Sequence, residues 1–275
     1  MTYVSVIVPT YKPGTYIYEC LESLYSQTLT KNMFEVILVL NGCNEPYKSE
    51  IKKWIEEHPK LFINLVHTTQ GGVSNARNIA LDCSKGEYIT FLDDDDYVSP
   101  TYLEELLSKA DKDTVSLCYP LSFIDGTKRY EPYYITKDYC KYSRVGKVLF
   151  YKPRRFFAGP VYKLIHRDII GDRRFDVRFK NGEDSLFMFL ISDKMKNVEF
   201  ASKNAIYYRR ERQNSASSDE SNLLFTLKNR KNLIIEYSKI YFNNRKEYKI
   251  SFYWSMVYSS IKKIIYEVLF KLSRR

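Results

Sequence analysis

Residues 86–96 read Gly-Glu-Tyr-Ile-Thr-Phe-Leu-Asp-Asp-Asp-Asp, and this stretch decides the fold. Residues 88–92 are aromatic, aliphatic or β-branched and follow a glycine, which predicts a short buried strand. The four acids 93–96 come at the end of the strand where open α/β sheets bind their ligands. Adjacent carboxylates suit Mg²⁺ or Mn²⁺, and such a cation can bridge a diphosphate. The alternative is a solvated acidic turn before a helix that Ser99-Pro100 would start.

The first half of the chain alternates strand and helix patterns. Continuous apolar runs predict buried strands, at residues 4–8, 34–40, 63–67 and 88–92. Apolar residues at helical spacing predict helices around them, at residues 16–25, 51–57, 73–80 and 102–110. Buried strands separated by helices indicate an α/β fold with a mostly parallel sheet.

The second half is less regular. Short strands and many aromatic residues follow residue 115, and a helix is predicted to begin near residues 182–184. The polar stretch 213–222 is typical of a mobile hinge, and two or three amphipathic helices are expected beyond it. We therefore divide the chain into parts at 1–115, 116–215 and 216–275.

The charge of the chain is concentrated in its last quarter. The net charge of +10 comes entirely from residues 201–275, which carry 16 basic and 6 acidic side chains. Such a segment predicts an anionic partner, which can be a membrane surface, a nucleic acid or a phosphorylated ligand. In the membrane interpretation its Tyr, Trp and Phe side chains lie at the lipid interface; in the alternative they pack on the rest of the protein.

Cysteine and histidine usage restricts the class of protein further. Five scattered cysteines without a C-x-x-C motif predict reduced, mostly buried thiols and a cytoplasmic setting. The three histidines have no metal-ligand spacing, and we expect them on the surface or in loops. No basic leader precedes the first strand and no uncharged window is long enough for a membrane span, so neither a signal peptide nor a span is expected.

Five motifs, in order, resemble those of the family 2 glycosyltransferases. They are Val-Ser-Val-Ile-Val-Pro-Thr-Tyr at 4–11, Gly-Val-Ser-Asn-Ala-Arg-Asn at 72–78, the run Lys-Gly to the four acids at 85–96, the Glu-Asp segment at 179–184, and Tyr-Tyr-Arg-Arg-Glu-Arg-Gln-Asn-Ser at 207–215. The resemblance implies a GT-A fold, which is Rossmann-like, here with a C-terminal helical extension. It also implies that 1–115 binds a nucleotide-sugar and 116–215 binds the acceptor.

The resemblance assigns donor-binding roles to residues near the strand ends. Pro9, Thr10 and Tyr11 would contact the base and ribose, and their alternative is a plain strand-ending turn. Arg77 would reach the base or a phosphate with its planar guanidinium group. In the alternative interpretation Arg77 lies on a solvated helix face and binds no ligand. Asn41 would contact the base.

Within the acidic run, the resemblance matches Asp93 and Asp95 to a D-x-D motif. Alternation along an extended backbone points these two side chains to one side. Asp95 would bind Mn²⁺ or Mg²⁺ directly, and Asp93 would reach the sugar, the ribose or the metal site. Asp94 is included as a donor contact, and Asp96 is expected either to support the residues that contact the ligand or to lie at the start of the helix.

The late motifs carry the expected catalytic base. Asp184 matches the base of the family, and a carboxylate in the first turn of a helix is favoured in its ionised form. Glu183 beside it would contact the acceptor or sugar, although an acidic pair there is also typical of helix capping. Arg209, Arg210 and Arg212 would supply positive charge over the diphosphate, with a surface basic strand as the alternative.

The second strand departs from the family pattern. It usually ends with an Asp that binds uracil, whereas this chain has Leu40 followed by Asn41. Leu40 cannot form that hydrogen bond, and Asn41 forms it only in the right orientation. A UDP-sugar remains the expected donor.

These observations predict an inverting, metal-dependent glycosyltransferase. The acceptor would be a hydroxyl of a glycan or lipid-linked glycan, in the synthesis of a bacterial capsule, O-antigen or exopolysaccharide. The expected location is cytoplasmic or peripheral at the inner membrane face, without a nucleic-acid partner. One alternative is a sugar-nucleotide nucleotidyltransferase, but that class usually needs a Gly-rich phosphate loop after the first strand, and this chain offers little of one. The other alternative is a non-catalytic scaffold subunit that retains the fold.

Overall fold

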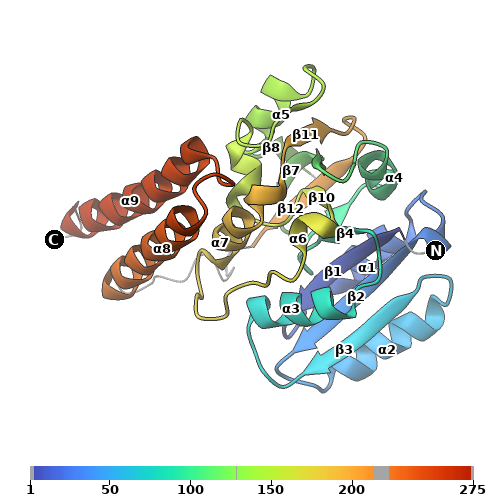
Figure 1. The fold of residues 1–275 in the computed structure, drawn as a ribbon. Coiled ribbons are helices and arrows are strands. Elements are labelled where there is room, and N and C mark those ends of the chain that lie inside the picture. Colours follow the sequence, from blue (N-terminus) through green and yellow to red (C-terminus); the bar gives the residue numbers. More distant parts are fainter. Residues whose placement is uncertain (1–2, 128, 213–222, 274–275) are drawn as a thin grey trace.

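The computed structural model describes residues 3–127, 129–212 and 223–273. Figure 1 shows the chain passing from a sheet-rich half, in blue, to two long helices, in red, that extend from the opposite side. The hinge expected at 213–222 lies outside the described residues.

An eight-stranded sheet forms the centre of the molecule, in the order β3-β2-β1-β4-β10-β6-β11-β9. Its strands are β1 Val4–Thr10, β2 Phe34–Asn41, β3 Ile63–Thr68, β4 Tyr88–Phe91, β6 Thr114–Leu117, β9 Val148–Leu149, β10 Lys163–His166 and β11 Asn197–Phe200. The first four are parallel, and β10 runs antiparallel to both β4 and β6. The predicted parallel α/β arrangement is confirmed, and the sheet continues past residue 115 through these later strands.

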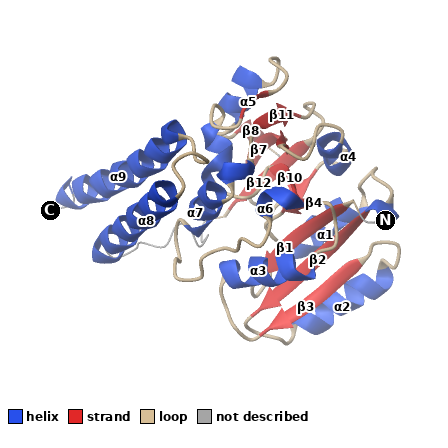
Figure 2. Ribbon diagram, in the orientation of Figure 1, coloured by secondary structure: helices blue, strands red, loops and turns tan. Residues whose placement is uncertain are grey.

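The helices of the first half cover the sheet through faces that the periodicity predicts (Figure 2). In α1 (Tyr16–Tyr25) the buried residues are Ile17, Cys20, Leu21 and Leu24, three or four positions apart. The other elements outside the sheets are η1 Lys31–Met33, α2 Tyr47–Glu57, α3 Val73–Cys83, α4 Tyr102–Leu107, α5 Thr136–Tyr142, η2 Arg154–Ala158, α6 Arg167–Ile170, α7 Glu183–Leu190 and η3 Ser192–Lys194.

A second, four-stranded sheet brings the arginine-rich motif to the acidic run. Its order is β5-β12-β7-β8, and its strands are β5 Tyr97–Val98, β7 Tyr119–Ile124, β8 Tyr130–Pro132 and β12 Ile206–Glu211. Tyr207 pairs with Val98 in antiparallel register, directly after the acids. The motif at 207–212 therefore lies beside residues 93–96, although more than a hundred residues separate them.

The C-terminal part forms a hairpin of two long helices, α8 (Leu223–Asn243) and α9 (Ile250–Ser273), side by side in Figure 1. Its inner face packs on α7, where Tyr237 bonds Ser185 and the Tyr248 hydroxyl donates to the carbonyl of Leu190. The expected amphipathic helices are thus present, and many of their aromatic residues pack on the rest of the protein. None of the helices in the described ranges is long and apolar enough to cross a membrane.

Two expectations about single residue types were wrong. His166 is 3% exposed, because its ring caps α6 by accepting from the backbone of Asp168 and approaches Glu87. Only two of the five free thiols, Cys20 and Cys118, are buried.

Candidate active site

The predicted donor residues converge at the carboxyl ends of β1, β2 and β4. Asn41 holds this edge together, since its side-chain nitrogen donates to the carbonyl of Thr10 at 2.6 Å. Its side-chain oxygen accepts from the backbone of Gly72 at 3.0 Å, at the start of α3. Gly72 has a φ of +120°, which favours glycine at this turn. Asn41 therefore positions two loops around the site, and its predicted contact with a base stays a prediction.

An exposed aromatic ring directly follows the carboxyl end of β1. Tyr11 is 54% exposed, and its ring lies so close to Gly42 that a Cβ at that glycine would come within 2.7 Å of it. Leu40 is fully buried in β2 and presents nothing to a ligand. An exposed ring at a strand end can stack on a nucleobase without reading its hydrogen-bonding edge.

Three of the four acids bond side chains that were also predicted for the site, and the first of them, Asp93, pairs with Arg77. Asp94 accepts a short hydrogen bond from the Thr10 hydroxyl. Asp95 forms an ion pair with Arg212 at 2.6 Å. Burial raises the pKa of Asp94 to about 7, and burial and Asp93 raise the pKa of Asp95. Arg212 thus offsets the charge of one acid of the run, while burial and the neighbouring carboxylates still raise the pKa of both Asp94 and Asp95.

Asp96 and Arg210 serve the framework of the site. Asp96 is buried and accepts from the Tyr207 hydroxyl and the Arg210 backbone, both at 2.7 Å. The Arg210 guanidinium pairs with Glu19 and Asp125, both at 2.6 Å. The Nε of Arg210 also donates to the backbone carbonyl of Asp95 at 2.7 Å, so the guanidinium lies beside the acidic run while its charge is shared with these two acids. Its predicted role over a diphosphate stays a prediction.

Arg77 connects the donor side to the predicted base. Its guanidinium is buried and contacts Asp93 at 3.0 Å through one nitrogen and Asp184 at 2.5 Å through the other. A planar guanidinium is suited to such a two-sided contact. The sequence predicts a donor contact for Arg77, and the structure adds the pairing with Asp184.

The two acids at the start of α7 lie in an enclosed environment. Burial raises the pKa of Asp184, and the Arg77 guanidinium opposes this shift. Burial and the neighbouring Asp184 raise the pKa of Glu183 to about 7, and its Oε2 is buried without a hydrogen-bond partner. Burial therefore works against the ionised form that the start of the helix was expected to favour, and the role of Asp184 as the base stays a prediction.

Sequence reasoning missed Lys163, a residue of β10 that is close enough to Asp184 for their charges to interact. Its ammonium is fully buried and donates to the carbonyls of Gly159 at 2.6 Å and Val161 at 2.5 Å. Burial lowers its pKa to about 7, against the opposing effects of Cys118 and Asp184. A lysine flanked by apolar residues within a short strand was the available signal.

Arg209 lies on the second sheet at the margin of the site. Its guanidinium stacks over Tyr133, 4.8 Å from the ring centre, and approaches Glu211 at 3.4 Å. Because its side chain is 29% exposed, it can still meet an anionic ligand. Its predicted role at the diphosphate stays a prediction.

The acidic run fits a divalent cation that a ligand helps to hold. Within the described ranges, no group of three Asp, Glu, His or Cys side chains is arranged to bind a metal alone. Asp93 and Asp95 nevertheless offer hard oxygen donors, and the raised pKa of Asp95 marks a local excess of negative charge. Diphosphate oxygens would complete the coordination, as is usual for Mg²⁺ sites.

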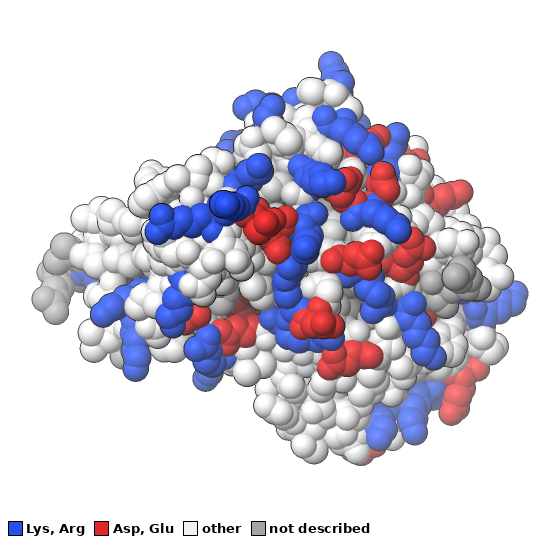
Figure 3. Space-filling view, viewed as in Figure 1, with Lys and Arg blue, Asp and Glu red and all other residues white. Residues whose placement is uncertain are grey.

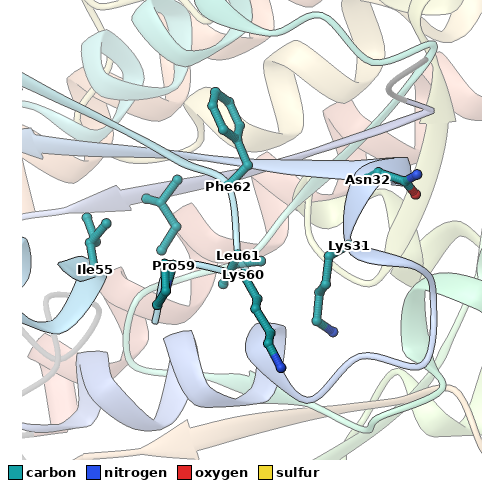
Figure 4. A pocket seen from close by; sticks show the side chains of 8 residues that line it. Lys31, Asn32, Ile55, Pro59, Lys60, Leu61 and Phe62 are labelled. Carbon is teal, nitrogen blue, oxygen red and sulfur yellow. The ribbon is translucent and has the colours of Figure 1, made fainter. Parts of the chain in front are cut away.

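A separate hollow lies away from this edge, near the amino ends of β2 and β3 (Figure 4). Its volume is about 580 Å³, and its lining includes Lys31, Lys60 and Phe62. None of its lining residues belongs to the acidic run or to the other predicted site residues.

The fold and site define an α/β protein whose predicted site residues gather at the carboxyl edge of its main sheet. Residues 5–174 match the model "Glycosyl transferase family 2", so the chain belongs to this family of glycosyltransferases. The family model ends before Asp184, Arg209 and Arg212, and their roles rest on the geometry described above.

The relatives include proteins of bacterial surface polymers. The chain is 32% identical over 223 residues to the minor teichoic acid biosynthesis protein GgaB of Bacillus subtilis, covering 78% of this chain and 23% of that protein. It is 27% identical over 212 residues to the poly(ribitol-phosphate) beta-N-acetylglucosaminyltransferase TarS of Staphylococcus aureus, covering 76% and 36%. The chain thus matches 23% of the length of GgaB and 36% of the length of TarS.

Solved structures show the same fold. TarS residues 1–349 in complex with UDP-GlcNAc align with a TM-score of 0.73 at 22% identity, over 94% of this chain and 72% of that one. The mannosyltransferase PcManGT of Pyrobaculum calidifontis, in complex with GDP-Man and Mn²⁺, aligns with a TM-score of 0.57 at 19% identity, over 86% and 63%. The GT-A fold expected from the motifs is confirmed by the likeness to TarS.

Proposed function

We propose that this chain is an inverting, metal-dependent glycosyltransferase. It transfers a sugar from a nucleoside-diphosphate sugar to a hydroxyl of a glycan or lipid-linked glycan. Residues 1–115 bind the donor, 116–215 bind the acceptor and carry the base, and 216–275 form an accessory tail. The setting is the cytoplasmic side of bacterial capsule, O-antigen or exopolysaccharide synthesis, in line with the surface-polymer relatives.

The double contact of Arg77 carries this proposal. A single buried guanidinium holds Asp93, at the donor edge, and Asp184, at the start of α7. The two carboxylates are therefore held on the same guanidinium group, each bound to a different nitrogen. This arrangement suits a displacement in which one acid adjoins the donor and the other deprotonates the attacking group.

In the proposed reaction Asp184 accepts the proton of the acceptor hydroxyl. The hydroxyl oxygen forms a bond to the anomeric carbon of the donor while the bond from that carbon to the diphosphate oxygen breaks. The electron pair of the broken bond leaves with the nucleoside diphosphate. Arg77 keeps Asp184 ionised and aimed, and Arg209 and Arg212 offset the charge of the leaving group.

Asp95 and Asp93 would hold Mn²⁺ or Mg²⁺, which when bound supplies positive charge to the departing diphosphate. Pro9, Thr10 and Tyr11 would contact the base and ribose, with Tyr11 as a stacking surface. Asp94 is held by Thr10, and it would line the phosphate side of the donor. Glu183 would contact the sugar or the acceptor.

A UDP-sugar is the proposed donor. The support is that TarS, which shares the fold, is known in complex with UDP-GlcNAc. Stacking on Tyr11 is compatible with uracil even though Leu40 cannot bond it.

We also propose that the hairpin contacts an anionic membrane surface. Five exposed apolar side chains follow one face of α9 at helical spacing, namely Trp254, Tyr258, Ile261, Ile265 and Leu269. Lysine and arginine side chains border the largely uncharged surface of the hairpin, at the left of Figure 3. An apolar stripe with basic flanks is typical of interfacial helices. No contact with nucleic acid is proposed.

Calorimetric titration of UDP, GDP, dTDP and CDP, with Mn²⁺ and then with EDTA, tests the proposed donor. Metal-dependent binding of one diphosphate is expected. Binding of a sugar 1-phosphate together with a nucleoside triphosphate would favour a nucleotidyltransferase instead. A folded protein that binds none of the four would support the scaffold alternative.

A further inference from the structure

A cleft of about 270 Å³ lies between the hairpin and the part of the chain that carries the base. It is lined by side chains from three directions. Arg154 and Arg155 come from η2, Arg230 comes from α8, and Lys262 comes from α9. The cleft therefore exists only because the hairpin packs on the catalytic part.

The cleft adjoins the predicted base. Ser185, which follows Asp184 in α7, lines it. Ala158 also lines it and precedes Gly159, where a Cβ would lie 3.6 Å from Oδ2 of Asp184. A ligand in the cleft can thus extend toward the carboxylate that would deprotonate the acceptor.

Most of the cations that line the cleft have no ion pair with a residue that the structure describes. Among the described residues, no carboxylate forms an ion pair with Arg154, Arg230 or Lys262, whereas Arg155 pairs with Asp138. Like charges gathered around one opening repel each other, and an anion between them relieves this repulsion.

One further acid lies near these cations. Arg230 acts on Glu183 electrostatically and lowers its pKa against the effect of burial, but the two do not form an ion pair. Asp184 is also close but already pairs with Arg77, and the lining itself includes four cationic side chains and no carboxylate. The cleft is net positive in its immediate surroundings.

The other lining groups suit a phosphate ester. Tyr258 and Ser259 on α9 provide hydroxyl groups beside the cations, and Met256 provides an apolar surface. Arginine forks and hydroxyl donors are the usual partners of phosphate oxygens. A neutral glycan would leave these cations without a counter-charge.

We infer that this cleft binds a phosphate group of the acceptor, so that the acceptor is a phosphate-bearing chain or lipid rather than a neutral glycan. The inference rests on the proposed function, because it assumes that Asp184 deprotonates the acceptor. The phosphate can belong to a polyol-phosphate polymer or to a lipid diphosphate. Both sources share the chemistry that Arg154, Arg230 and Lys262 recognise.

Calorimetric binding to the full chain tests this inference with three probes. They are a glycerol-phosphate tetramer, a polyprenyl-diphosphate sugar in detergent micelles, and a neutral tetrasaccharide. We expect one or both phosphate-bearing probes to bind, and the one that binds identifies the source. Arg230→Gln and Lys262→Gln should each weaken that binding about tenfold, as expected for loss of a charged hydrogen bond.

Neighbouring lysines that do not line the cleft serve as matched controls. Lys231→Gln and Lys263→Gln remove the same charge from the same helices and should change the affinity less than twofold. Equal losses in variants and controls, equal binding of the neutral tetrasaccharide, or no binding of either phosphate probe would overturn the inference. UDP binding is measured on the same samples, so that failure of the donor site is seen separately.

Discussion

Two regions differ in how their charged side chains are paired. One is the carboxyl edge of the main sheet, where the donor is proposed to bind (the donor edge), and the other is the cleft between the α8–α9 hairpin and η2 (the hairpin cleft). At the donor edge Arg77 pairs with Asp93 and Asp184, and Arg212 pairs with Asp95. In the cleft, Arg154, Arg230 and Lys262 have no ion pair with any described residue. The charges of the donor edge are thus paired within the protein, whereas these three cations of the cleft are available to pair with the proposed phosphate ligand.

This difference indicates which contacts serve architecture and which serve recognition. A buried ion pair that loses one partner leaves a costly isolated charge, so donor-edge substitutions should affect both folding and activity. Exposed cations contribute little to folding, so cleft substitutions should affect binding alone. The experiments below examine this contrast, beginning with the largest expected effect.

Asp184→Asn should reduce kcat by a factor of about 10³, because the proton acceptor is lost. UDP affinity should stay within about twofold, because Arg77 loses its pair with Asp184 but keeps its pair with Asp93. Steady-state kinetics and calorimetry measure the two quantities. Glu183→Gln is the matched control and should cost much less. Transfer by the Asp184 variant at the rate of the parent would remove Asp184 as the base.

Arg77→Gln should lower the free energy of unfolding by about 3 kcal/mol, because two carboxylates lose their buried partner. Chemical denaturation measures this change. Arg174→Gln breaks a pair with Asp82 at the surface and should cost less than about 1 kcal/mol. Equal costs for both variants would show that the donor edge is no more preorganised than the surface.

Removal of Mn²⁺ with EDTA should weaken UDP binding at least about tenfold, since the diphosphate and the acidic run then repel each other. Asp95→Asn should abolish most of the metal dependence. Asp168→Asn, at an exposed carboxylate, is the control. UDP affinity that is indifferent to both metal and Asp95 would exclude the proposed metal role.

Ile265→Glu should weaken binding to phosphatidylglycerol vesicles about tenfold, because it places a charge in the apolar stripe of α9. Co-sedimentation measures the bound fraction. Val145→Glu changes a similarly exposed apolar residue elsewhere and should have no effect. Unchanged binding by the Ile265 variant, or equal binding to neutral vesicles, would contradict the membrane role.

Lys163 gives the smallest expected effect, seen as a pH dependence of stability. Its pKa of about 7 in the folded protein lies below the ordinary value of 10.5, so the unfolded chain binds more protons above pH 7. The parent should therefore gain about 1 kcal/mol relative to Lys163→Met between pH 7 and pH 8. Unfolding free energies at the two pH values measure this gain, and a constant difference would contradict it.

Much of the donor half could be predicted from local sequence. Residues 4–8, 34–40, 63–67 and 88–92 are continuous apolar runs, and all four form parallel strands of one sheet. The acids after the fourth run fall at the carboxyl edge for the same reason. The apolar runs are sufficient here because β1 and β2 are buried along their whole length and β3 and β4 are at least partly buried.

The acceptor side depends on contacts that no local pattern encodes. The pairing of β12 with β5 brings residues 207–212 to the acids, and the packing of the hairpin on α7 creates the cleft. Arg210 and Arg212 are two residues apart, yet one pairs with framework acids and the other with Asp95. Desolvation of Asp184 likewise comes from the enclosing fold, which the helix-dipole argument does not include.

The configuration of the transferred sugar tests the central claim most directly. Proton NMR of the product formed from an α-linked UDP-sugar reports the anomeric configuration through the coupling of its anomeric proton. A single displacement with Asp184 as base predicts a β-linked product, because attack occurs opposite to the departing diphosphate. An α-linked product would contradict the single displacement and the role assigned to Asp184.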